Sequence, residues 1–99
     1  MASFNFREHK TANGIVLAVC DSELIDRTLK FGDVDFEVSS SFYGTEKAES
    51  GQILNLVERC HVANFVGRDI VSILKENGLI REESVLMIGD VPHVQLLVD

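Results

Sequence analysis

The sequence predicts an α+β fold, in which a single mixed sheet of five strands carries helices mainly on one face, within one domain spanning residues 1–99. Three observations predict it. The dipeptide Asn13-Gly14, a strong hairpin signal, separates two strand-like segments. Residues 15–20 are apolar at every position, which is typical of a strand covered on both faces. Later segments repeat apolar residues at helical spacing, and helices interleaved with hairpins indicate an α+β layer fold.

The first part of the chain predicts two strands, a helix and an outlying strand. Residues 3–20 are expected to form two antiparallel strands, of which residues 15–20 are the central one. Asp21 can cap a helix over residues 22–30, because apolar side chains there recur at helical spacing. Residues 33–38 alternate acidic and apolar side chains, which predicts a strand with one solvated and one buried face.

The second part of the chain predicts a loop, two helices and a final hairpin. Residues 39–49 have no clear period and are expected to form a loop. Apolar stripes predict helices over residues 50–61 and 64–77. Residues 85–88 and 94–98 predict the last two strands, with a turn between them. The expected order of elements is β-β-α-β-α-α-β-β.

The charge balance argues against general nucleic-acid affinity. Nine basic and sixteen acidic residues give a net charge of −7, and binding to phosphates needs cations that displace counterions. The acidic excess falls entirely after residue 30, so any surface that faces an anion is expected within residues 1–30. Alternatively, the acidic excess only keeps the protein soluble. The basic residues up to this point are Arg7, Lys10, Arg27 and Lys30.

Targeting and redox features indicate a cytoplasmic protein. The longest apolar run has six residues, too few to cross a membrane, and residues 1–10 lack the apolar core of a signal peptide. Cys20 and Cys60 are the two cysteines, and their wide separation argues against a disulfide framework. We therefore expect neither a membrane segment nor a disulfide.

Cys20 and His93 are the candidates for an enzymatic function. Cys20 closes an apolar strand just before a predicted helix, whose first amides would stabilise a thiolate. His93 follows Pro92 in a predicted turn and could act as the base, with Asn64 or Gln95 to orient it. The alternative is that Cys20 is a small buried hydrophobe, because no Cys-x-x-Cys motif accompanies it.

Neither a metal nor a cofactor is predicted. Cys60 and His61 are adjacent in sequence, and adjacent ligands rarely turn both donor atoms toward one metal. No glycine-rich phosphate loop occurs, although Asn64 and Gly67 could offer free amides to an anion; close packing is the other explanation of Gly67. Tyr43 could stack on an RNA base or anchor its loop to the core.

Four blocks at residues 18–21, 42–44, 63–67 and 88–95 carry a family resemblance that extends over nearly the whole chain. With them the chain resembles the small archaeal domain-of-unknown-function family numbered four-twenty-four, provisionally described as an RNA-binding component of the translation apparatus. The resemblance implies a non-catalytic module that binds RNA or a translation protein. Nine positions are implied as the candidate binding site: Cys20, Asp21, Tyr43, Gly44, Asn64, Gly67, Pro92, His93 and Gln95. The alternative is a small enzyme or ligand-binding protein that uses Cys20 and His93.

Overall fold

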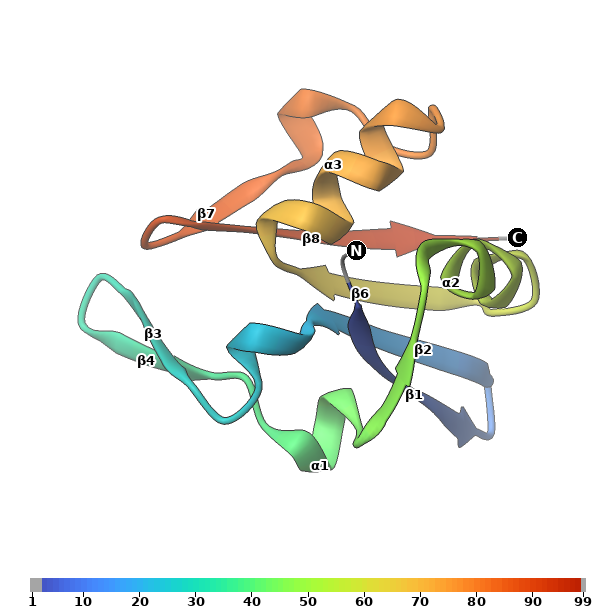
Figure 1. The fold of residues 1–99 in the computed structure, drawn as a ribbon, viewed down its shortest axis with the longest axis horizontal. Helices are drawn as coiled ribbons and strands as arrows, with labels where there is room; N and C mark the ends of the chain where they lie inside the picture. Colours follow the sequence, from blue (N-terminus) through green and yellow to red (C-terminus); the bar gives the residue numbers. More distant parts are fainter. Residues whose placement is uncertain (1–2, 99) are drawn as a thin grey trace.

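The computed structural model describes residues 3–98 and shows one main sheet with helices on one face and a hairpin on the other (Figure 1). The sheet has six strands in the order β5-β1-β2-β6-β8-β7. The strands are β1 (Phe4–Thr11), β2 (Gly14–Asp21), β5 (Glu46–Ala48), β6 (Val62–Val66), β7 (Leu86–Ile88) and β8 (Val91–Leu97). Neighbours are antiparallel except β2 and β6, which are parallel. The mixed sheet and the α+β class are confirmed, with six strands in place of five.

β2 is a central strand, as its unbroken apolar run predicts. It pairs with β1 on one side and with β6 on the other. Leu17 and Val19 point into the larger of two cores and are fully buried, while Ala18 and Cys20 point into the smaller core on the other face. Both faces of β2 are therefore covered at its C-terminal end, which explains why no polar side chain interrupts the run.

Helices α2 (Ser50–Glu58) and α3 (Arg68–Glu76) cover one face of the sheet (Figure 1). α2 begins with a capping box, in which the side chains of Glu49 and Gln52 each bond the other's backbone. Ile53 of α2 and Ile70 of α3 are fully buried in the larger core together with Phe65 of β6. The helices therefore lie mainly on one face, as predicted. No helix within residues 3–98 is long and apolar enough to cross a membrane.

The predicted helix over residues 22–30 is wrong. A single 3-10 turn, η1 (Ser22–Leu24), is followed by β3 (Thr28–Phe31), which forms a separate two-stranded sheet with β4 (Val34–Glu37). Asp26 has a φ of 64°, outside the helical region, and its amide bonds to the carbonyl of Val38. Pairing with β4 therefore prevails over the helical spacing of a few apolar residues.

The predicted strand over residues 33–38 is β4, and it is outlying, as expected. Its buried face is shorter than the alternation suggests. Phe36 is half-buried and Val38 fully buried, whereas Val34 lies near the hairpin tip and is 62% exposed. The hairpin therefore reaches beyond the core that its base covers.

The predicted helix over residues 64–77 begins four residues late, because residues 62–66 form strand β6. His61 starts the pairing: its amide donates to the carbonyl of Ile15, and its ring Nδ1 accepts from the amide of Ile15. Gly67, with a φ of 130°, separates the strand from α3. β6 lies between β2 and β8 in the sheet, and four of its five residues are apolar. A run this short does not by itself distinguish a strand from a helix.

Two further segments differ from the prediction. The expected loop over residues 39–49 contains a one-turn helix, α1 (Ser40–Tyr43), and strand β5. The Ser39 hydroxyl accepts the amide of Phe42 and so caps that turn. At the C-terminal hairpin, β8 begins at Val91 rather than residue 94, because a tight turn at residues 89–90 already pairs Val91 with Ile88. Pro92 and His93 therefore lie on a strand.

Candidate functional site

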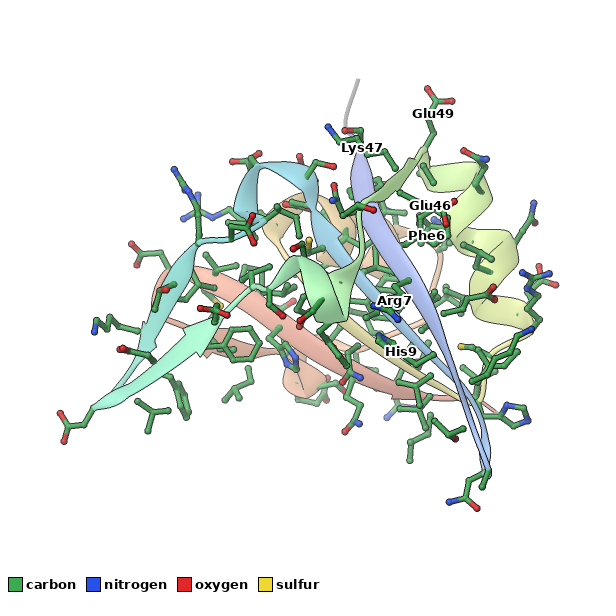
Figure 2. All side chains as sticks on the ribbon, turned by 90° about the horizontal axis from the view of Figure 1, so that it is seen from below. Phe6, Arg7, His9, Glu46, Lys47 and Glu49 are labelled. Atoms are coloured by element: carbon green, nitrogen blue, oxygen red, sulfur yellow. The ribbon has the colours of Figure 1, made fainter. Side chains whose placement is uncertain are left out.

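Strand register places three rows of side chains on the sheet face opposite α2 and α3. In one row Arg7 lies beside Ala18, Ala18 beside Asn64, and Asn64 beside Gln95. The flanking rows are His9–Val16–Val62–Leu97 and Lys47–Asn5–Cys20–Val66–His93–Leu86. Figure 2 shows Arg7 and His9 on the side of β1 near α1, whereas Phe6 lies toward α2.

These rows contain no acidic residues, although acidic residues outnumber basic ones in the sequence. The sequence contains sixteen acidic residues, and none of them stands in the three rows that the register assigns to this face. The polar members are amides, two histidines, one arginine and one lysine, besides the Cys20 thiol. The strands therefore contribute no carboxylate to these rows in a chain of net charge −7.

Part of this face is covered and part is open. The β3–β4 hairpin, η1 and α1 bury Ala18, Cys20 and Val66 within the smaller core. Farther along the strands, Leu97 is 75% exposed and Gln95 is exposed, while Asn64 and His93 are half-buried at the border. We call the uncovered part the open sheet face: His9, Val16, Val62, Asn64, Leu86, His93, Gln95 and Leu97.

A cavity of about 270 Å³ lies where the covering elements meet the open sheet face. We call it the border cavity. Its lining residues come from four elements: Phe36 and Glu37 from β4, Phe42 and Tyr43 from α1, Asn64 from β6 and His93 from β8. Aromatic rings and hydrogen-bonding side chains therefore converge from segments far apart in the sequence.

Contacts between aromatic rings hold the walls of the cavity. The Phe36 and His93 rings meet edge to face, with centroids 5.6 Å apart. Phe42 stacks on His9, with centroids 5.0 Å apart, and the Phe42 carbonyl lies 2.8 Å from the His9 Nε2. Burial lowers the pKa of His93 below its usual 6.5. Near neutral pH its imidazole is therefore uncharged and offers one donor and one acceptor.

Cys20 and His93 do not form a catalytic pair. They share a row, but Val66 stands between them, so their Cα atoms are about 10 Å apart at two strand spacings. Cys20 is fully buried, and burial, with the nearby charge of Asp21, raises the pKa of its thiol to about 12. The thiol therefore stays protonated at neutral pH and lies out of reach of the proposed base.

Asp21 and Gly67 form a structural cap for α3. The Asp21 carboxylate accepts the amides of Asp69 and Ile70, each at 3.0 Å. Gly67 has a φ of 130°, and a Cβ placed on it would overlap that carboxylate. The first amides of α3 thus already bind an anion of the chain itself, so the predicted anion cradle at residues 64–67 is filled.

Three carboxylates gather near this cap. Oxygens of Asp21, Glu23 and Asp69 lie within 4.8 Å of one another and line a cavity of about 260 Å³. Arg27 and Arg68 line the same cavity, so two guanidinium groups of the chain offset part of the acidic charge. Burial raises the pKa of Asp21, against the lowering effect of its two amide bonds. This cluster therefore lies at the N-terminal cap of α3, which Asp21 forms.

Tyr43 and Gly44 fasten α1 to β1. Tyr43 is 2% exposed, and burial raises the pKa of its hydroxyl. The Gly44 carbonyl accepts the side-chain amide of Asn5 at 3.0 Å, and a Cβ on Gly44 would strike the backbone of Phe6. Tyr43 therefore anchors its segment, and the neighbouring Phe42 is the half-buried ring beside the cavity.

The structure divides the nine predicted positions into two groups. Tyr43, Asn64 and His93 line the border cavity, and Gln95 lies beside Asn64 on the open sheet face. The others are buried in the scaffold: Cys20, Asp21, Gly44, Gly67 and Pro92, whose carbonyl accepts the Gly67 amide.

Phe36 and Glu37 are the cavity residues that the sequence did not indicate as a site. The sequence predicted their strand, β4, but not its partner strand, β3. A short turn at residues 32–33 between two alternating segments is a hairpin signal, and it could have placed β4 over the sheet.

Comparisons with known proteins support the family resemblance that the four sequence blocks carry. A crystal structure of an uncharacterized conserved protein from Methanopyrus kandleri is similar to this chain, with a TM-score of 0.77 and 28% sequence identity. The similarity covers 99% of this chain and 95% of that one. No curated protein matches the sequence. The family described as "Protein of unknown function (DUF424)" matches residues 8–98, and the chain therefore belongs to the DUF424 family.

Proposed function

We propose that this protein is a non-catalytic cytoplasmic module that binds single-stranded RNA of the translation apparatus through the open sheet face. The observation that carries the proposal is the absence of acidic residues from the three rows that form this face. Elsewhere the excess of carboxylates repels phosphate. RNA can therefore approach the sheet on this side with the least electrostatic cost.

The chemistry of the open sheet face suits bases better than phosphates. Sheets that bind single-stranded RNA present aromatic rings for stacking and polar groups for the edges of unpaired bases. Asn64 and Gln95 supply amides that both donate and accept, and Phe36 and Phe42 supply rings at the border. The apolar side chains of Leu86 and Leu97 give exposed contact area beside them.

Few phosphate contacts are available, so affinity should be modest. Arg7 and Lys47 are the basic residues in the three rows, and the Arg7 guanidinium donates to the Ser41 carbonyl while staying exposed. Lys10 alternates to the other face of β1, Arg27 lies beside the acidic cluster, and Lys30 is paired with Asp35. The four basic residues of the first thirty therefore do not form one surface.

The test is a chemical-shift map of the protein with a ten-nucleotide single-stranded RNA of mixed sequence at low salt. Binding as proposed shifts amides of β6 and β8 and the side-chain amides of Asn64 and Gln95, and leaves α2 and α3 unchanged. Shifts confined to the helical face, or none at millimolar RNA, would contradict the proposal. Capture of a translation protein that survives ribonuclease treatment, with no RNA binding, would assign the face to a protein partner and overturn it.

A further inference from the structure

We infer that the border cavity binds one unpaired nucleobase that carries an exocyclic amino group, which is adenine, cytosine or guanine and not uracil. The inference rests on the proposed function, because RNA is the proposed source of the base. It narrows that function from a face to a single recognition site. It also assigns a task to Glu37, and a second one to Phe36 besides its packing against the smaller core.

The size and walls of the cavity suit a flat heterocycle. About 270 Å³ lies below the range of roughly 300–1,000 Å³ that is typical of sites for drug-sized ligands. Phe36 and Phe42 supply aromatic walls, and the contacts of these rings with His93 and His9 fix their positions before a ligand arrives. A preorganised wall reduces the entropy cost of stacking a planar ring.

Asn64 lines the cavity and provides a paired donor and acceptor. A primary amide matches an edge on which an amino group stands next to a ring nitrogen, as in adenine and cytosine. Two parallel hydrogen bonds would hold such a base in the plane of the amide. Asn64 is half-buried, so these bonds would form with partial exclusion of water.

Glu37 discriminates between bases that carry an exocyclic amino group and uracil, which carries none. A rotated amide could also pair with the keto edges of guanine and uracil, so Asn64 alone gives little selectivity. The Glu37 carboxylate lines the same cavity and accepts hydrogen bonds without donating any. It attracts an exocyclic amino group and repels a carbonyl oxygen or a phosphate. The cavity therefore selects adenine, cytosine and guanine over uracil.

His93 completes the polar lining without adding a positive charge. Its edge contact with Phe36 fixes the ring, and its burial favours the neutral form. A neutral imidazole can bond a base or a ribose hydroxyl, but it does not attract phosphate as a cation would. The site is therefore built for the base rather than for the backbone.

Two sets of probes distinguish RNA from a free nucleotide as the source of the base. The first set is AMP, CMP, GMP and UMP; the second is ten-nucleotide homopolymers of A, C and U. We expect AMP, CMP and GMP to shift the side-chain amide of Asn64 with dissociation constants at least fivefold lower than that of UMP. The A and C homopolymers should bind correspondingly better than U.

Variants identify the residues responsible. Glu37→Gln lies at an exposed position, so it should fold normally and reduce the preference for AMP, CMP and GMP over UMP to under twofold. Asn64→Leu should weaken binding of the preferred bases at least tenfold, and the matched control Asn55→Leu, on the exposed side of α2, should leave it unchanged. Asn64→Asp keeps the size of the side chain but loses the donor to the ring nitrogen, so it should weaken binding of the preferred bases while the preference over UMP remains.

The outcomes separate the two proposals. RNA that binds the open sheet face without base preference, and is unaffected by Asn64→Leu, overturns the inference and leaves the proposed function standing. AMP or CMP binding at Asn64 without RNA binding supports the cavity chemistry with a free nucleotide as the source, and overturns the proposed function. Failure of both probe sets overturns both.

Discussion

The carboxylate of Asp21 occupies the space in which a side chain at Gly67 would begin. Asp21 ends strand β2 and Gly67 directly follows strand β6, and because these strands are parallel neighbours both residues reach the same edge of the sheet. There the carboxylate turns into the first turn of α3 and accepts two of its amides. One contact therefore ties the central strands to the helix that covers them.

Replacing Gly67 should destabilise the fold more than replacing another left-handed glycine. Gly67→Ala combines backbone strain at a φ of 130° with loss of the Asp21 cap, which together should cost about 2–4 kcal/mol. Gly78→Ala is the control, because its φ is 70° but nothing lies near the added Cβ; it should cost about 1 kcal/mol. Equal costs in urea denaturation would contradict the contact.

The same contact predicts coupling between the two positions. Asp21→Ala leaves the amides of Asp69 and Ile70 without their acceptor and should cost about 1–3 kcal/mol. In that background the steric part of Gly67→Ala is relieved, so the double variant should be more stable than the sum of the single effects by about 1 kcal/mol or more. A double-mutant cycle measures this, and additive effects would show that the two groups do not interact.

Cys20 should resist alkylation in the folded protein. Its side chain is fully buried and the raised pKa, about 12, leaves almost no thiolate at pH 7. Iodoacetamide should therefore modify it only as fast as the protein unfolds, a rate that mass spectrometry follows over time. Rapid modification of Cys20 at neutral pH, well ahead of Cys60, would restore the enzymatic alternative.

His93 should make stability fall in mild acid. Burial lowers its pKa in the folded state, so below about pH 6.5 the unfolded chain binds the proton more readily. The free energy of unfolding should thus decrease as the pH falls from about 6.5 toward the lower folded-state pKa, and be fully retained above 6.5. NMR titration of the His93 ring gives the folded pKa directly. A value at or above 6.5 would show that the ring is not desolvated.

The local sequence pattern predicted correctly those elements whose burial it reveals. The apolar run at residues 15–20 indicates a strand that is covered on both faces, although it does not say which elements cover it. Residues 28–31 show the limit. Leu29 fits a helical stripe with the residues before it and alternates with Phe31 as well, and only pairing with β4 decides between the two.

The candidate site depends on register and on covering elements, which short segments do not encode. Asn64 resembles a helix cap in sequence, and its place beside Gln95 follows only from the pairing of β6 with β8. The border cavity further requires that β4 and α1 fold back over that row. The residues Asn64, His93 and Gln95 were therefore identified, while the Phe36 and Glu37 wall was not.

A charge placed on the open sheet face tests the central claim most directly. Gln95→Glu adds one negative charge there, and Asn55→Glu adds one on the exposed side of α2; the two variants have the same net charge. Fluorescence anisotropy with a single-stranded ten-nucleotide RNA, over a salt series, measures both. One or two phosphate contacts predict a slope of about −1 in log affinity against log salt. Gln95→Glu should weaken binding about fivefold at low salt, and Asn55→Glu should match the unmodified protein. Equal weakening by both variants, or a slope near −6, would contradict binding through the open sheet face.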